Sequence, residues 1–256
     1  MKQFQLKKMT LAVALGFGAS LAYAQSGPIK IGVVTPLSGT YTPIGEQVKM
    51  GLDLAAKEIN AAGGINGRKV DLIYEDEEAN PAVATQKAEK LFQVEKVDFL
   101  TGTVNSGSTL AVGQLAERNN KLIATTVSFA DSITGDKCSP NVFRVNARAG
   151  MQSAALAAWV DKEIPKANIF FIGPDYEMGR STVSAFKKAS TEKGAKDAGE
   201  VFAPLDNKDY SPYFGQVRAA KAFLRWSGED LAQRSGVSLS SIRRVESAEG
   251  IPEGQN

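Results

Sequence analysis

The sequence predicts an α/β protein, in which a Rossmann-like parallel-sheet lobe precedes a truncated second α/β lobe and a small all-α tail. Continuous apolar runs, typical of strands buried on both faces, alternate with helical patterns in the order β-α-β-α-β-α-β. The alternation begins again after a link and stops near residue 220. We expect four segments, at residues 1–24, 25–140, 141–216 and 217–256.

The first lobe is predicted to contain four strands and three helices. Its strands are expected at residues 29–36, 69–74, 97–102 and 122–127. A first helix over residues 46–62 ends at Gly63-Gly64. A second is capped by Asn80, has Pro81 in its first position and runs to about residue 95. The third runs from Ser106 or Ser108 to residue 118, which completes a parallel sheet with helices on both faces.

The second lobe repeats the pattern with fewer elements. Strands are expected at residues 142–145, 168–172 and 200–203, and helices at 151–163 and 181–193. Two consecutive units of this kind predict two lobes with a cleft between them. Ligands of such folds bind outside the carboxyl ends of the strands.

Composition excludes several classes of chemistry. The 256 residues contain no histidine and one cysteine, Cys138, which excludes a Ser-His-Asp triad, a histidine metal site, an internal disulfide and a CxxC site. The formal charge of +2 is too small to predict nucleic-acid binding. The acidic run at residues 75–78 is expected to be a solvated strand end before the Asn80 cap, and we expect no metal and no cofactor.

Residues 1–24 have the pattern of a secretory signal peptide. Lys2, Lys7 and Lys8 precede an apolar run from Met9 to Leu21, and Ala22-Tyr23-Ala24 fits the cleavage rule. We expect cleavage after Ala24 and export to the periplasm. The alternative is an N-terminal membrane anchor, although a run of about 13 residues is short for a bilayer span.

Six sequence pieces carry a family resemblance. They are IKIGVVTPLSG at 29–39, EINAAGGINGRKV at 58–70, YEDEEANPAVA at 74–84, GTVNSGSTLA at 102–111, FRVNA at 143–147 and GPDYEMGRS at 173–181. Their order and spacing over about residues 28–220 resemble the leucine/isoleucine/valine-binding branch of the type I periplasmic substrate-binding proteins. The resemblance implies a protein that is not an enzyme. It would capture a small amino-acid-like or carboxylate ligand between two lobes and deliver it to an inner-membrane ABC importer permease.

The turn after the third strand is the first candidate ligand site. Asn105, Ser106 and Ser108 lie where a helix begins, and unpaired backbone amides at a helix N-terminus attract anions. The resemblance implies that Ser106 holds a ligand carboxylate, and the alternative is that Ser106 only caps the helix. It also implies ligand contacts from Ser128 and Phe129, after the fourth strand, and from Tyr176 or Met178. Phe129 departs from the smaller residues of the family, which favours an aromatic or larger acid.

The C-terminal segment, at about residues 217–250, resembles part of a Cro/repressor-type helix-turn-helix. Helices are expected at residues 217–226, 228–234 and 238–246. By resemblance, Leu239, Ser240 and Arg244 would face bases, and Ser241 and Arg243 would lie near the DNA backbone. The alternative is that these helices pack on the truncated lobe. The two resemblances overlap at residues 215–222, which indicates a fusion by recombination, a frame accident or a join made in assembling the sequence.

Two functions follow from these patterns. The first is the periplasmic solute-binding component of an ABC-type importer, with a branched-chain amino acid or a similar small carboxylate, aromatic acids included, as ligand. The second is a DNA-binding transcriptional regulator whose N-terminal part senses a small molecule. DNA is a partner only under the second.

Overall fold

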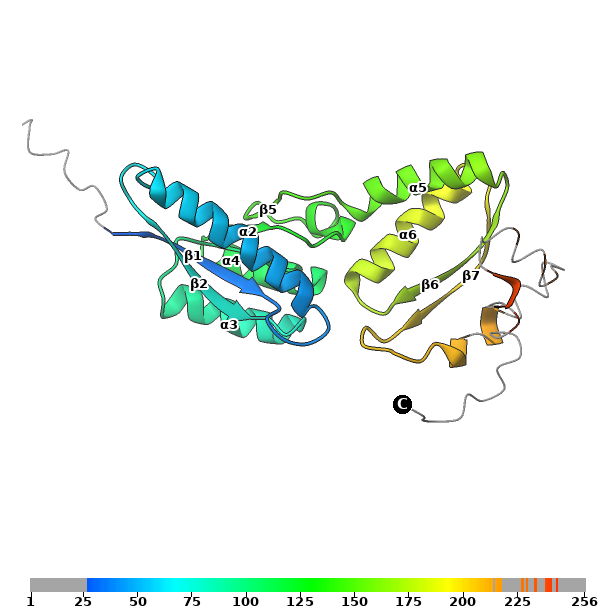
Figure 1. Cartoon of the computed structure of the whole chain (residues 1–256), viewed down its shortest axis with the longest axis horizontal. Helices are drawn as coiled ribbons and strands as arrows, with labels where there is room; N and C mark the ends of the chain where they lie inside the picture. The colour runs from blue at the N-terminus through cyan, green and yellow to red at the C-terminus, as the bar shows by residue number, and fades with distance from the viewer. Residues whose placement is uncertain are drawn as a thin grey trace, which may run out of the picture.

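The described part of the chain contains two parallel β-sheets, which belong to the two groups of elements seen in Figure 1. The structure is a computed structural model that describes residues 27–213, 215–217, 227, 229, 233, 238–240 and 243. The first sheet has the strand order β2-β1-β3-β4-β5. Its strands are β1 (Ile29–Thr35), β2 (Val70–Asp76), β3 (Phe99–Thr101), β4 (Ile123–Thr125) and β5 (Val142–Arg144). The predicted α/β class with a parallel sheet is confirmed.

Strand β5 belongs to the first sheet, whereas the sequence assigned it to the second lobe. It pairs with β4 in parallel, with Ile123 opposite Val142 and Thr125 opposite Arg144. The first sheet therefore extends past the boundary expected at residue 140. The link at residues 126–141, which contains a short helical turn, is long enough for the crossover that two neighbouring parallel strands need.

Helices α3 (Pro81–Gln93) and α4 (Ser106–Arg118) cover the core of the first lobe. Their apolar side chains, such as Leu91 and Val112, are fully buried with Leu100 of β3 and Ile123 of β4. The start of α3 is as predicted, because Asn80 Oδ1 accepts the amides of residues 82 and 83 at 2.9 and 3.3 Å. Helix α2 (Thr42–Ala61) begins four residues before the predicted position.

The second group of elements is built on strands β6 (Asn168–Pro174) and β7 (Lys196–Ala203), which pair in parallel. Helices α5 (Ala149–Glu163) and α6 (Glu177–Thr191) pack on each other, and Figure 1 shows them beside these strands. A short 3-10 helix, η1 (Asp131–Thr134), lies between β4 and β5. Helix α6 contacts both α4 and η1, which joins the two lobes.

The acidic run at residues 75–78, where β2 ends, is not the solvated strand end that the sequence predicted. Glu77 is fully buried and Glu75 is 9% exposed, whereas Glu78 is exposed. Glu75 is buried beside two lysines, Lys87 at 3.1 Å and Lys90 at 2.5 Å. The Glu77 carboxyl group instead accepts hydrogen bonds from the backbone amides of Val104 and Asn105.

Several predictions fall on residues that are not described. The expected signal peptide at residues 1–24 lies outside the described residues, as do Ser241 and Arg244. Residues 211–213 and 215–217 are helical. The exposed side chain of Arg243 donates to Glu229 Oε1 at 3.0 Å. Within the described ranges, no helix is both long and apolar enough to span a membrane.

Candidate functional site

Helix α4 begins at the carboxyl edge of the first sheet, and Asn105 is its N-cap. Asn105 Oδ1 accepts the amides of Gly107 and Ser108 at 2.8 and 3.3 Å. Its Nδ2 donates to the carbonyl of Ala79 at 2.7 Å. Both polar groups of this buried side chain are therefore engaged inside the protein, and Asn105, not Ser106, caps the helix.

Ser106 is the first residue of α4 and is fully buried. Its Oγ accepts the backbone amide of Ala130 at 3.3 Å, which joins α4 to the loop after β4. That bond uses an oxygen lone pair and leaves the hydroxyl proton of Ser106 for another acceptor. Ser106 therefore combines a donor with the positive end of a helix, an arrangement that suits a carboxylate.

Ser128 follows β4 and contacts the turn between β3 and α4. Its Oγ is 3.0 Å from the carbonyl of Thr103 and 3.1 Å from that of Val104, and it also pairs with Thr109 Oγ1. The side chain thus fixes the end of β4 to the end of β3. Its position shapes the site, while its hydroxyl is already used by protein atoms.

Arg144, at the end of β5, holds the loop after β4, which carries Phe129. The Arg144 guanidinium donates from Nη1 to the carbonyl of Ser128 at 2.9 Å and from Nη2 to that of Ala130 at 2.7 Å. Burial lowers the pKa of Arg144 from its usual value, and the charge of Asp131 opposes that shift. Phe129 is half-buried, and its carbonyl accepts the amide of Ala149 at 2.7 Å. Asn105, Ser106, Ser128 and Phe129 form what we call the turn cluster.

Two tyrosines meet from opposite lobes. Tyr41 Oη donates to Tyr176 Oη at 2.7 Å, and Tyr176 Oη donates to Met178 Sδ at 3.3 Å. The two rings have centroids 6.2 Å apart and are tilted by 48°. Burial raises the pKa of both phenols, so both stay protonated at neutral pH. We call Tyr41, Tyr176 and Met178 the tyrosine cluster.

Each tyrosine lies at the start of a helix that packs closely on the end of the preceding strand. Tyr41 is the N-cap of α2 and Tyr176 the N-cap of α6, and neither uses its side chain for capping. One turn further on, Gly45 and Gly179 pack against a proline at the end of the preceding strand. A Cβ at Gly45 would lie 1.8 Å from the carbonyl oxygen of Pro36, and one at Gly179 would lie 2.0 Å from that of Pro174. Both helices can approach their strand ends only with glycine here.

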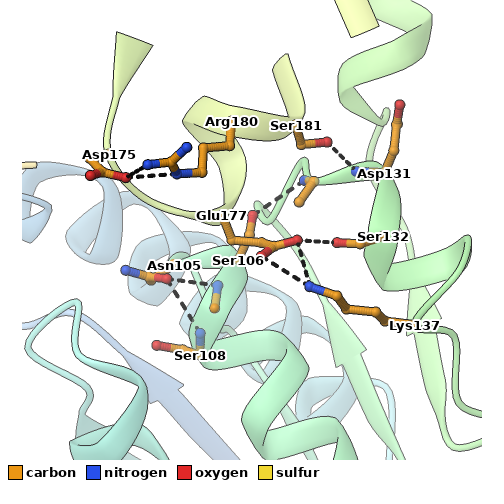
Figure 2. A network of polar contacts seen from close by, with 12 residues as sticks. Asn105, Ser106, Ser108, Asp131, Ser132, Lys137, Asp175, Glu177, Arg180 and Ser181 are labelled. Atoms are coloured by element: carbon orange, nitrogen blue, oxygen red, sulfur yellow. Dashed lines mark hydrogen bonds and ion pairs between the residues drawn. The ribbon is translucent and has the colours of Figure 1, made fainter. Parts of the chain in front are cut away.

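A polar network joins η1 to the start of α6 (Figure 2). Ser132 Oγ donates to Glu177 Oε1 at 2.6 Å, and the amide of Asp131 donates to Ser181 Oγ at 2.8 Å. Lys137 Nζ lies 3.4 Å from both carboxylate oxygens of Glu177. These contacts hold the second lobe to the loop that carries Phe129 and Ala130.

The six ligand contacts predicted from the sequence thus fall into two clusters, four residues in the turn cluster and two in the tyrosine cluster. The sequence analysis missed Tyr41, Arg144 and Glu77. Tyr41 and Glu77 follow β1 and β2 at the same carboxyl edge, so the rule that selected Ser106 applies to them too. Among the described residues no group of three or more His, Cys, Asp or Glu side chains is placed to hold a metal ion.

Comparison with known proteins gives matches over most of the chain. A family model described as periplasmic binding protein matches residues 28–226. The Leu/Ile/Val-binding protein homolog 3 of Brucella melitensis is 30% identical over 223 residues, which make up 87% of this chain and 59% of that protein. The chain therefore spans less than two thirds of the length of this relative. The family match includes residues 217–226, which the sequence analysis assigned to the first helix of a helix-turn-helix, so that assignment is not supported.

Solved structures give the same result. The solute-binding protein of an ABC transporter from R. palustris, crystallised in complex with benzoate, superposes with a TM-score of 0.69 at 30% identity and covers 76% of this chain and 53% of that one. A leucine binding protein from Thermotoga maritima has a TM-score of 0.69 at 24% identity, covers 75% and 54%, and shows the same fold.

Proposed function

Because the chain belongs to the periplasmic binding protein family, we propose that it is the solute-binding component of an ABC-type importer. In this role it binds a small carboxylate between its two lobes and presents it to an inner-membrane permease. It performs no catalysis. The observation that carries the proposal is the turn cluster, where Ser106 offers a hydroxyl donor at the N-terminus of α4 and is joined through the Ala130 amide to the loop that carries Phe129.

The second lobe supports the same function from the other side. Tyr41 and Tyr176 join the lobes through a phenol pair, and Glu177 and Ser132 join them through η1. A solute held at the turn cluster would be enclosed when these contacts form, because lobe closure removes water from both sides of the ligand. This arrangement favours binding over chemistry, since it offers donors and aromatic surface to a solute.

The ligand class that fits is a carboxylate with an apolar body. Relatives are described as Leu/Ile/Val-binding and as a benzoate complex. Phe129 with Tyr41 and Tyr176 adds aromatic surface, which favours an aromatic acid, while a branched-chain amino acid shares the same carboxylate. We therefore take benzoate and L-leucine as the two probes.

The location follows from the family and from the N-terminal pattern. We propose export to the periplasm by the signal peptide at residues 1–24, with cleavage after Ala24. Cell fractionation with N-terminal sequencing tests this. A periplasmic chain that begins at Gln25 supports the proposal, and an unprocessed cytosolic chain contradicts it.

Calorimetric titration of the full chain tests the ligand class. Benzoate or L-leucine should bind, and benzylamine, which lacks the carboxylate, should not. Ser106→Ala should weaken binding about 10- to 100-fold, because a hydrogen bond to a charged group is lost. Ser190→Ala is the matched control, since Ser190 is a buried serine at the far end of α6. Equal affinities for the two variants would contradict the site, and absence of heat with both acids would contradict the carboxylate class.

A further inference from the structure

The first observation is a carboxylic side chain buried behind the turn cluster. Glu77 follows β2 directly and is 0% exposed. Its backbone amide donates to the carbonyl of Thr35 at 3.2 Å, which fixes it to the end of β1. The residue is therefore held between two strand ends, with its side chain pointing to the β3–α4 turn.

The two carboxyl oxygens of Glu77 have different surroundings. Oε1 accepts the backbone amides of Val104 at 2.8 Å and of Asn105 at 3.2 Å. Oε2 is buried without a hydrogen-bond partner, and so is Oγ of Ser108 in the same turn, within the described part of the chain. A neutral acid fits this arrangement, since its carbonyl oxygen accepts both amides and its O–H is a donor for the Ser108 hydroxyl. A carboxylate would bury a charged oxygen for which the Ser108 hydroxyl is the one donor named among the described residues, and burying a charge is costly.

The charges around Glu77 favour the same form. The end of β1 and the β3–α4 turn present only uncharged side chains to it, from Thr35, Val104, Asn105 and Ser108. The one charged group found to act on it is Asp76. Burial would raise the pKa of Asp76, but hydrogen bonds from Ser38, Glu78 and Leu37 hold that pKa below its usual value, so Asp76 is ionised. Burial raises the pKa of Glu77 and the negative charge of Asp76 adds to the rise, although the amides of Val104 and Asn105 and the hydroxyl of Ser108 oppose it.

We propose that Glu77 is a positioning residue of the carboxylate site, that its neutral acid form holds the β3–α4 turn, and that an anion bound at α4 is accompanied by uptake of a proton on Glu77 wherever Glu77 is ionised in the free protein. The proton passes from solvent to Oε2, and no other bond changes. The coupling to a ligand rests on the function proposed above. Its cause is that two carboxylates in one buried site do not both ionise without a large penalty.

Three variants separate this role from simple packing. Glu77→Gln keeps the oxygen that accepts the two amides and places an N–H where the acid has its O–H. Glu77→Ala removes both. Glu78→Gln is the matched control, because Glu78 is the neighbouring acid and is exposed.

Binding of benzoate to the full chain is measured by calorimetry between about pH 5 and pH 8, a range above the usual glutamate pKa of about 4.3. We expect the wild-type affinity to fall as the pH rises, by at most about tenfold per unit for one coupled proton. Glu77→Gln should bind with a flat pH profile and at least wild-type affinity near pH 8, Glu78→Gln should follow the wild type, and Glu77→Ala should bind about tenfold or more weakly. If all four proteins share one pH profile, the proposal is overturned.

A measurement without ligand keeps the two proposals separate. A glutamate whose pKa is raised on folding stabilises the protein fully below its unfolded pKa, and this stability is lost as the pH rises through the folded value. The free energy of unfolding of the wild type should therefore fall relative to Glu77→Gln across that window. If it does so while benzoate and L-leucine give no heat, the neutral acid stands and the proposed function fails. If the two stability curves are parallel while benzoate binds, the proposed function stands and the role of Glu77 is refuted.

Discussion

Replacing Asn105 by alanine should destabilise the protein more than the same change at Asn80. Both residues cap a helix, and each accepts two backbone amides through Oδ1 at similar distances. The Asn80 side chain is exposed, whereas Asn105 is buried and also donates to the carbonyl of Ala79. Comparing the two variants therefore separates the effect of losing a helix cap from the effect of also losing an interior hydrogen bond.

The expected magnitudes follow from these contacts. Loss of an asparagine cap costs about 1 kcal/mol, which is the whole effect expected for Asn80→Ala. Asn105→Ala adds the lost bond to Ala79, a net of about 0.5–1.5 kcal/mol, and leaves buried amides without an acceptor. We expect about 2–3 kcal/mol in total, which lowers the melting temperature by about 4–12 °C for a protein of this size.

Urea denaturation of the full chain measures both variants. The unfolding midpoint, followed by circular dichroism, should shift about twice as far for Asn105→Ala as for Asn80→Ala, with the same slope. Equal shifts would refute the reasoning, because they would mean that the interior bond of Asn105 to the loop after β2 adds nothing to stability.

Three further predictions concern the links around the site. Tyr41→Phe removes the phenol donor to Tyr176 and should weaken benzoate binding by up to about tenfold in calorimetry, and the effects of Tyr41→Phe and Tyr176→Phe should not add in the double variant. Arg144→Met should raise the benzoate dissociation constant and lower the melting temperature, because the carbonyls of the loop after β4 lose a charged donor, whereas Arg118→Met, at an exposed arginine in the last turn of α4, should change the affinity little. Burial would raise the pKa of Glu75, but its two lysine partners hold that pKa below the usual value, so the stability advantage of wild type over Glu75→Gln should be present above about pH 4.3 and be lost on acidification. An unchanged advantage at low pH in a pH series of urea melts would contradict this.

The sequence predicts local structure well where one short pattern decides it. Asn80 followed by Pro81 predicts the start of α3, and the structure confirms the cap. Apolar runs predict the strands because parallel strands buried on both faces need them. The sheet to which a short strand belongs is decided by long-range pairing instead, and for that reason β5 was assigned to the wrong lobe.

Side-chain roles at the site depend on contacts that the sequence does not contain. The position of Ser106 at a helix start was predicted, but Asn105 is the residue that caps the helix. The Ser128 hydroxyl lies within hydrogen-bond distance of two backbone carbonyls. Glu77 was read as solvated because acidic runs usually are. Its burial depends on the amides of the β3–α4 turn, which come from residues 27 and 28 positions further along the chain.

Hydrogen–deuterium exchange of the full chain, with and without saturating benzoate, tests the central claim most directly. If a carboxylate is held at the N-terminus of α4 and enclosed by the second lobe, exchange should slow at residues 104–108, at 128–130 and at 175–181, while the start of α3 is unchanged. Protection confined to one lobe, or located away from the α4 turn, would contradict the account.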